Sequence, residues 1–345
     1  MRKKVALLMS GGIDSSYSAY LLSKDYDVCG IYLKLHNKEE KNNFYINRCA
    51  LVSKKLKIEF HVIDLQEEFK SIIYDYFVES YKEAKTPNPC AMCNPNIKFG
   101  LGLQKALELN CDYIASGHYA RIKNIKGVNY IQEALDKTKD QSYFLFGISK
   151  EAKDKLIFPL GEKTKEEVKK EAFSAMPWFG ALEEYKDSQE ICFVDKDYIK
   201  TISKDVNVEK EGDILDREGN VVGKHRGYMQ YTIGKRKGLE MHKSNAPSYV
   251  LEINPKNNTL VVGDKNDLAK REIIANVMSL DNFEDGNYNV KVRYKSNSIN
   301  ANIKLENNKI KATLLENIYG VASGQALVIY RDDIVLGGGF IESSL

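Results

Sequence analysis

The stretch Val5-Ala-Leu-Leu-Met-Ser-Gly-Gly-Ile-Asp-Ser-Ser16 decides the fold of this chain. It begins with a short apolar run, Val5 to Met9, which is typical of a buried parallel strand. A Gly-Gly turn follows, and Ser15 to Ser23 continues as a helix. Glycines let the backbone approach an anion closely, and the start of a helix offers N–H donors and a positive dipole end. The stretch therefore predicts a strand, a phosphate-binding turn and a helix.

Neither of two common phosphate motifs matches this turn. The Walker motif needs a Gly-Lys-Ser/Thr step, and the dinucleotide motif needs a different glycine spacing. Ser10, Ser15 and Ser16 can add hydroxyl donors, and Asp14 can orient the loop or help to hold Mg²⁺. A plain turn with a helix cap is the alternative. The position between a strand and a helix favours pyrophosphate binding.

Strands and helices are expected to alternate over the first 120 residues. Further strands are expected at 28–33, 58–63 and 113–116, and helices at 42–56, 65–84 and 97–109. Residues 85–95 contain three prolines and are expected to form a loop. A hairpin is expected at 120–133, and Thr164-Lys-Glu-Glu167 predicts a capping box that opens a helix. This alternation predicts a parallel sheet with helices on both faces.

The sequence changes character after residue 203, where short strand patterns lie between turn signals. Strands are expected at 249–253, 260–262, 289–294 and 326–330. We expect three domains: an α/β domain at 1–203, a central β-rich domain at 204–272 and a barrel-like β domain at 273–345.

The composition is that of an ordinary globular protein, with 43% apolar and 29% charged residues and a net charge of +3. No apolar run approaches the length of about 20 residues that spans a bilayer. The apolar stretch after Met1-Arg-Lys-Lys4 is too short for a secretory signal. We therefore expect a cytoplasmic location, no membrane partner and no disulfide framework from the six cysteines.

Two cysteines follow a proline-stiffened segment in Thr86-Pro-Asn-Pro-Cys-Ala-Met-Cys-Asn94. The segment is expected to present Cys90 and Cys93 near a helix start, where a thiol is more readily ionised. The pair fits a redox site, half of a zinc site, an iron–sulfur ligand pair or a catalytic thiol with a helper. A closed zinc site needs four ligands, and no second Cys-x-x-Cys follows. Cys29, Cys49 and Cys111 are expected to be structural. His36, His61, His225 and His242 show no sequence spacing that indicates a metal.

The Ser10–Ser16 string resembles the signature of the N-type ATP pyrophosphatases, the PP-loop family. Further motifs along the chain resemble the tRNA-specific 2-thiouridylases of that family. These are Thr86–Pro89 with Cys93-Asn94, Gly117-His-Tyr119, Lys139-Asp-Gln-Ser-Tyr-Phe-Leu145, Ile191-Cys-Phe193, Tyr231-Thr-Ile-Gly-Lys-Arg-Lys-Gly-Leu239 and Leu336-Gly-Gly-Gly339. The resemblance runs from about residue 4 to the end in a consistent order.

The resemblance implies an enzyme that converts the wobble uridine of tRNA to 2-thiouridine. ATP, with Mg²⁺, would adenylate the C2 oxygen, and AMP and pyrophosphate would be released. Cys192 would carry sulfur as a persulfide received from a sulfur-carrier protein. Cys93 would act as the nucleophile or assisting thiol, and a Cys93–Cys192 disulfide would form. The protein would act as a monomer.

The resemblance also assigns binding residues. The ATP-binding set is Leu8, Met9, Ser10, Gly11, Gly12, Ile13, Asp14, Ser15, Leu33 and Gly117. The tRNA-binding set is Asn88, Pro89, Cys90, His118, Lys139, Asp140, Gln141, Arg293, Tyr294 and Gln325. Basic residues at Lys224, Arg226, Lys235–Lys237 and Lys295 suggest an RNA-facing surface in the β region.

One departure from the family pattern opens an alternative. An Asp of the better-known pattern is replaced here by Cys90, so Cys90, Cys93 and Cys192 supply three thiols. Three cysteines can hold a [4Fe–4S] cluster with one iron open to sulfide. Two other functions stay open: another PP-loop ligase or amidotransferase, similar to argininosuccinate synthetase, and a non-catalytic RNA-binding protein.

Overall fold

The computed structural model describes residues 2–179, 191–194, 197–241 and 248–345. These residues fold into two compact units. Of the described residues, the first unit holds 2–73, 90–179 and 330–336, and the second holds 74–89, 191–194, 197–241, 248–329 and 337–345. Within the described ranges, no helix is both long enough and apolar enough to cross a bilayer.

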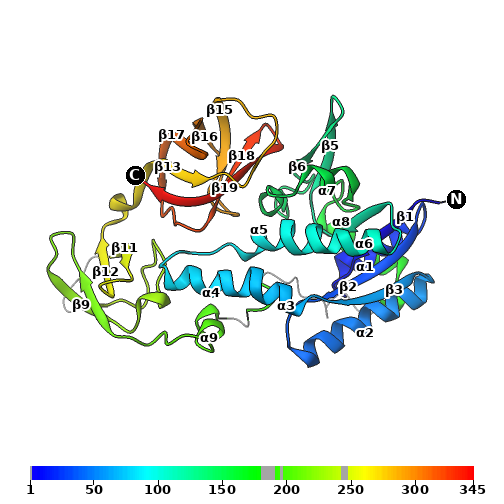
Figure 1. Ribbon diagram of the computed structural model, residues 1–345, viewed down its shortest axis with the longest axis horizontal. Coiled ribbons are helices and arrows are strands. Elements are labelled where there is room, and N and C mark those ends of the chain that lie inside the picture. The colour runs from blue at the N-terminus through cyan, green and yellow to red at the C-terminus, as the bar shows by residue number, and fades with distance from the viewer. Residues whose placement is uncertain (1, 180–190, 195–196, 242–247) are drawn as a thin grey trace. The chain divides into compact units, whose positions relative to one another are not determined.

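A five-stranded parallel sheet organises the first unit, in the order β3-β2-β1-β4-β7. Figure 1 labels its strands β1, β2 and β3. Its strands are β1 (Lys4–Leu8), β2 (Asp27–Lys34), β3 (Glu59–Asp64), β4 (Tyr113–Ser116) and β7 (Leu156–Ile157). Val5 of the central strand pairs with Val28 on one side and Tyr113 on the other. The parallel sheet predicted from the apolar runs is confirmed.

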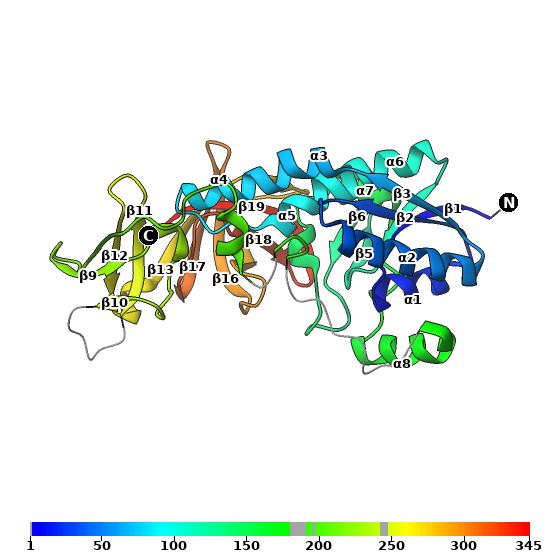
Figure 2. The same ribbon diagram turned by 90° about the horizontal axis from the view of Figure 1, so that it is seen from below.

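Helices cover both faces of this sheet, as Figure 2 shows for α1 and α6. The helices are α1 (Ile13–Leu22), α2 (Glu39–Leu56), α6 (Gly102–Glu108), α7 (Lys150–Lys155) and α8 (Lys165–Ala175). Val5 and Leu7 pack with α1, α2 and α8 in one core. Leu8 and Leu33 lie close to Gly102 of α6 on the opposite face. This arrangement follows from the alternation of side chains along each strand.

The helix expected at 65–84 is present but carries a π-helical turn. It consists of α3 (Gln66–Phe69), the π-helical segment Lys70–Tyr74 and α4 (Asp75–Lys82).

The prediction of a loop at 85–95 is wrong from Pro89 onward. Helix α5 (Pro89–Cys93) begins there and continues into the π-helical segment Asn94–Leu101. Proline is tolerated in the first turn of a helix, because the N–H it lacks has no partner there. Gly100 permits the wide turn after Pro95, since a Cβ on Gly100 would lie 2.6 Å from the Pro95 oxygen. Cys90 and Cys93 are therefore inside a helix, not ahead of one.

The hairpin expected at 120–133 is confirmed as β5 (Arg121–Ile125) and β6 (Val128–Gln132). Its tip residues, Lys126 and Gly127, have φ angles of +50° and +85°. Such positive values are typical of a tight hairpin turn.

The capping box at the start of α8 is also confirmed. The Glu167 N–H donates to Thr164 Oγ1 at 3.2 Å, and the Thr164 N–H donates to Glu167 Oε2 at 2.7 Å. We expect Thr164→Ala to lower the free energy of unfolding by about 1 kcal/mol, because it removes the cap acceptor. Urea denaturation followed by circular dichroism measures this loss. Thr164→Ser keeps the hydroxyl and should stay close to wild type, and equal losses in both variants would contradict the prediction.

The second unit is largely β, as expected for residues 204–345. Its first sheet has the order β10-β9-β8-β12-β11. The strands are β8 (Gly212–Leu215), β9 (Val221–His225), β10 (Glu240–Met241), β11 (Tyr249–Asn254) and β12 (Thr259–Gly263). Ile214, Val250 and Leu260 form its buried core. The short helix α9 (Tyr198–Ile202) precedes this sheet.

Six later strands close into a barrel, in the order β13-β17-β16-β15-β18-β19 with β19 pairing back to β13. They are β13 (Ala269–Asn276), β15 (Gly286–Lys291), β16 (Ile299–Glu306), β17 (Lys309–Tyr319), β18 (Ala326–Arg331) and β19 (Ile334–Ser344), with the short strand β14 (Ser279–Leu280) beside β19. The barrel-like fold is confirmed. The strand expected at 289–294 ends earlier, at Lys291, so Arg293 and Tyr294 follow the strand.

The motif Gly337-Gly-Gly339 has a packing role in β19. A Cβ on Gly337 would lie 2.0 Å from the Ser279 oxygen, and one on Gly339 would lie 1.7 Å from the Asn276 oxygen. Real side chains cannot occupy such positions, so only glycine fits.

Residues 330–336 belong to the first unit through contacts with the β5–β6 hairpin. Asp333 Oδ2 accepts from Arg121 Nη2 at 3.2 Å and from Gln132 Nε2 at 2.8 Å. Ile334 pairs with Gln132 in the sheet. A segment far along the sequence thus completes the first unit.

Candidate nucleotide site and thiol segments

The Ser10–Ser16 loop lies where β1 meets α1, at the carboxyl edge of the parallel sheet. Leu33 is the last but one residue of β2 at the same edge, and Gly117 follows β4. Ligands of open α/β sheets bind at this edge. The structure therefore brings together, in the first unit, the residues that the sequence assigned to ATP.

The serines of the loop stabilise its shape. Ser15 Oγ accepts from the Ser10 N–H at 3.1 Å. Ser16 Oγ donates to the Gly12 oxygen at 2.8 Å, and Ser16 is fully buried. Ser16 thus holds the turn together and does not present its hydroxyl to an anion, whereas Ser10 is exposed.

A side chain would be crowded at two glycines of the site. Gly11 has a φ of +73°, and its Cβ would lie 3.0 Å from the Tyr45 oxygen. A Cβ on Gly117 would lie 3.0 Å from the Ser15 nitrogen and 3.1 Å from the Asp14 carbonyl carbon. The loop backbone therefore packs directly against the end of β4.

Asp14 is the centre of a charged cluster that the sequence did not predict. Lys165 Nζ lies 2.7 Å from both carboxylate oxygens of Asp14. The Tyr119 hydroxyl donates to Asp14 Oδ1 at 2.9 Å. Lys165 is only 8% exposed. A buried cation thus stands beside the phosphate loop.

A signal for Lys165 was present in the sequence. It is the first residue of α8, and a cation in the first turn of a helix opposes the helix dipole. In the folded protein this lysine is buried, and a buried lysine at such a position indicates a specific anionic partner. The capping box identified the helix start, but nothing local identified the partner, which lies 151 residues earlier.

His118 lies between two aromatic rings and two polar groups. The Phe99 and Phe158 ring centroids lie 5.9 and 6.2 Å from its own. Its Nε2 is 3.4 Å from Lys98 Nζ and its Nδ1 is 2.7 Å from Ser116 Oγ. An ammonium group can only donate, so Nε2 accepts and Nδ1 carries the proton. Burial, and then the Lys98 charge, hold the pKa of His118 well below its usual value.

This environment predicts a pH dependence of stability. The unfolded chain protonates His118 near pH 6.5 while the folded protein keeps it neutral, so the free energy of unfolding falls as the pH drops below 6.5. The slope from one such group approaches about 1.4 kcal/mol per pH unit. We expect His118→Gln to flatten the curve between pH 6.5 and 5, measured by denaturant titration. The pKa of His225 is also lowered by burial, and its contribution to the pH dependence of the free energy of unfolding is the same in both proteins. Equal slopes in both proteins would contradict the prediction.

Cys90 and Cys93 lie one helical turn apart on α5, so they share a helix face. Cys93 is buried, and Cys90 is half-buried. The neighbouring Asn94 donates from Nδ2 to the Phe144 oxygen at 2.9 Å. Its Oδ1 is buried and has no hydrogen-bond partner among the described residues. Such an orphan acceptor beside Cys93 is typical of a site that receives a ligand or water.

Cys192 lies in the second unit and is exposed. The adjacent Phe193 is buried, and its ring centroid is 5.1 Å from that of Phe77 and 5.8 Å from that of Tyr74. Phe193 thus anchors the turn on the helix that carries Phe77, while Cys192 faces outward. Residues 186–190, which precede the motif Ile191-Cys-Phe193, and His242 lie outside the described residues.

Three residues assigned to tRNA by resemblance form a compact turn in the first unit. Asp140 Oδ1 accepts from the Ala134 N–H at 2.8 Å, and Gln141 Oε1 accepts from the Tyr119 N–H at 2.9 Å. Asp140 is buried, while Lys139 and Gln141 are half-buried. The turn is thereby tied to the segment that carries His118.

Gln325 and Arg293, which the resemblance also assigned to tRNA, each contact other residues of the second unit. Gln325 Nε2 donates to the Thr86 oxygen at 3.0 Å and to the Pro87 oxygen at 3.2 Å. The segment Thr86–Pro89, which includes Asn88, is therefore held against the barrel. Arg293 lies against Gly320, whose Cβ would be 3.1 Å from Arg293 Nη2.

The basic residues of the β region are largely paired. Lys224 forms an ion pair with Asp213 at 2.6 Å, and Arg226 pairs with Glu240 at 2.7 Å. Lys235 donates to the Gln230 oxygen at 2.7 Å. Arg236 and Lys237 remain exposed at the tip of their loop.

Three domain families match the chain in order. The tRNA methyl transferase HUP domain matches residues 3–196, the tRNA methyl transferase PRC-barrel domain matches residues 199–264, and the aminomethyltransferase beta-barrel domain matches residues 271–341. These families describe the same succession of a parallel sheet and two β units that the structure shows.

Relatives match over nearly the whole chain. The tRNA-specific 2-thiouridylase MnmA of Helicobacter hepaticus is 56% identical over 343 residues, covering 99% of each chain. Those of Helicobacter pylori and Nitratiruptor sp. are 53% identical over 340 residues and 46% identical over 344 residues, covering 98% and 99% of this chain and 99% and 100% of theirs. With its phosphate loop, its buried cation and its two thiol segments, the chain belongs to the family of tRNA-specific 2-thiouridylases.

Proposed function

We propose that this enzyme activates the wobble uridine of tRNA with ATP and then replaces its C2 oxygen by sulfur. The C2 oxygen attacks the α-phosphorus of ATP, the bond to the β-phosphate breaks, and pyrophosphate leaves. A carbonyl oxygen is a poor leaving group, whereas the resulting adenylate leaves as AMP. The observation that carries the proposal is the loop at Ser10–Gly12 beside the buried Lys165–Asp14 pair.

Sulfur is proposed to arrive on Cys192. Its exposure, with Phe193 as an anchor, supports a role in accepting sulfur from a carrier protein as a persulfide. The terminal sulfur attacks C2 and AMP leaves. The Cys93 thiolate then attacks the Cys192 sulfur, which leaves the transferred sulfur on C2 and forms a Cys93–Cys192 disulfide. A dithiol reductant restores both thiols for the next turnover.

We propose that Mg²⁺ enters the site bound to the phosphates of ATP. Both carboxylate oxygens of Asp14 already contact Lys165, so this carboxylate fits the role of holding the lysine better than that of a magnesium ligand. The ATP-binding set then comprises the backbone of the loop, Leu33 and Gly117. A cytoplasmic location and a monomeric state are part of the same proposal.

A [4Fe–4S] cluster is the second candidate for sulfur delivery. Cys90 and Cys93 share one face of α5, which suits two cysteine ligands of one cluster, and Cys192 would supply a third. When bound, such a cluster would present sulfide at an open iron. The persulfide route needs only Cys93 and Cys192, whereas this route also needs Cys90.

The two routes are separated by anaerobic purification, an iron count and a thiolation assay. Iron-free protein is given ATP, Mg²⁺, tRNA and a persulfide donor, and the released AMP and pyrophosphate are compared with the 2-thiouridine formed. The persulfide route predicts one AMP and one pyrophosphate per thiouridine, and full activity of Cys90→Ser.

Dependence on iron together with loss of activity in Cys90→Ser would establish the cluster route instead. Cys111→Ser is the matched control, because Cys111 is buried and outside both routes. Absence of pyrophosphate release with every tRNA would contradict the adenylation step itself.

A further inference from the structure

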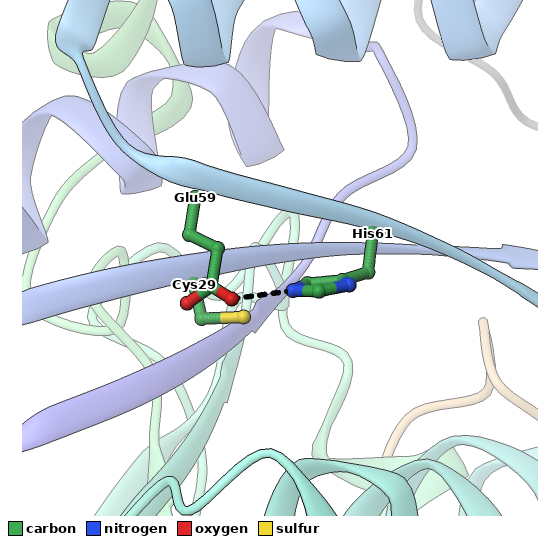
Figure 3. A group of neighbouring side chains, drawn as sticks. All are labelled: Cys29, Glu59 and His61. Atoms are coloured by element: carbon green, nitrogen blue, oxygen red, sulfur yellow. Dashed lines mark hydrogen bonds and ion pairs between the residues drawn. The ribbon is translucent and has the colours of Figure 1, made fainter.

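A group of metal-ligating side chains lies on the parallel sheet away from the phosphate loop. Cys29 comes from β2, and Glu59 and His61 come from the edge strand β3 (Figure 3). Cys29 is the register partner of Glu59, and His61 follows two residues later. Side chains two residues apart point to the same face of a strand. Strand pairing therefore places all three on one face.

The ligand atoms of these residues lie within 4.8 Å of one another. His61 Nε2 and Glu59 Oε1 are 2.7 Å apart, as the dashed line in Figure 3 marks. The ligand atoms of a tetrahedral zinc ion lie about 2.0–2.3 Å from the metal. Two such ligand atoms are therefore about 3.5 Å apart. Small rotations of the Glu59 and His61 side chains bridge this difference.

The burial of the three residues is graded. Cys29 is completely buried, while the side chains of His61 and Glu59 are 35% and 45% exposed. The sulfur therefore forms the floor of the group, and the imidazole and the carboxylate form its rim. An ion can reach the rim from solvent, and a water molecule can complete the coordination.

Lys4 contacts the Glu59 carboxylate through the oxygen that does not face His61. Its Nζ lies 2.7 Å from Glu59 Oε2 and donates to the Leu109 oxygen at 3.1 Å. This ion pair engages one carboxylate oxygen, and the other oxygen faces His61. Such outer contacts orient a ligand in protein metal sites. A thiolate and a carboxylate together balance the charge of a divalent ion.

We propose that Cys29, Glu59 and His61 form a binding site for a divalent ion of the zinc class. Thiolate, imidazole and carboxylate are the ligands that Zn²⁺ accepts, and the thiolate disfavours Mg²⁺ and Ca²⁺. Cys29 pairs with Ala6 in mid-strand, whereas the phosphate loop begins beyond Leu8. The site is thus separate from the nucleotide site, and a bound ion would fasten the edge strand β3 to β2.

The test uses the full chain with Cys90, Cys93, Cys111 and Cys192 changed to serine. These changes remove the thiol that hydrogen-bonds to Cys29 and the three thiols assigned to sulfur delivery. After treatment with a chelator and a reductant, the protein is titrated with Co²⁺ and then with Zn²⁺. We expect one equivalent of Co²⁺ to bind and to give a sulfur-to-cobalt charge-transfer band. One equivalent of Zn²⁺ should then take its place and raise the thermal midpoint. His61→Gln added to this protein is expected to weaken zinc binding at least tenfold, while Glu67→Gln, an exposed carboxylate nearby on α3, is expected to change nothing.

Cys29→Ser is expected to remove the charge-transfer band. If that variant does not fold, the rim variants His61→Gln and Glu59→Gln carry the test, because both residues are partly exposed. A serine-substituted chain that binds no zinc at a twofold excess would overturn the proposal. Zinc affinity and a cobalt band that are unchanged by His61→Gln would overturn it equally.

Discussion

Lys165→Met is expected to slow the tRNA-dependent release of pyrophosphate from ATP by about a hundredfold or more. The ammonium group of Lys165 is the buried cation beside the phosphate loop, and it contacts both oxygens of Asp14 at 2.7 Å. Its removal leaves a carboxylate facing an incoming triphosphate, so charge repulsion replaces charge compensation. Radiolabelled ATP and chromatography of the products measure the rate.

Two controls separate a charge effect from a loss of fold. Lys165→Arg keeps the charge and should retain more activity than the methionine variant. Thermal unfolding of each variant shows whether the variant is folded and as stable as the wild-type protein. A folded methionine variant that releases pyrophosphate as fast as the wild-type enzyme would show that Lys165 does not act in this step.

Cys192→Ser is expected to abolish 2-thiouridine formation while pyrophosphate release continues. The change should lower thiolation by about three orders of magnitude or more, because a hydroxyl cannot carry a transferable sulfur. Cys192 is exposed, so the substitution should leave stability unchanged. Mass spectrometry of digested tRNA measures thiouridine, and a pyrophosphate assay measures adenylation in the same reaction.

Cys93→Ser distinguishes the two thiols. Cys93 is proposed to act after sulfur has reached C2. The Cys93→Ser variant should therefore accumulate tRNA that is linked to Cys192 through a disulfide bond, which a reductant cleaves. Gel electrophoresis with and without reductant would show that adduct. Wild-type thiolation by Cys192→Ser, or by Cys93→Ser in a single turnover without reductant, would contradict the proposed order of steps.

The sequence predicted the parts of the fold that depend on local pattern. The apolar run at Val5–Met9 and the Gly-Gly turn identified the strand, the loop and the first helix, because burial and turn chemistry act over a few residues. The start of α5 was missed since the three prolines of the segment outweighed the fact that proline is accepted in a first helical turn.

Contacts between distant segments were beyond the sequence. Lys165 and Asp14 are 151 residues apart, so their ion pair depends on how α8 packs on α1. Cys29 and His61 become neighbours only through strand register. The closure of the barrel by β13 and β19 likewise depends on pairing that no local spacing shows.

The hydrogen bonds of Asp333 bear on how this protein is made. Its partner Gln132 emerges from the ribosome 201 residues earlier. At about 5–20 residues per second, the hairpin waits roughly 10–40 s for the segment that completes it. During synthesis the nascent catalytic part therefore exposes an unfinished sheet edge, which is the kind of surface that chaperones bind.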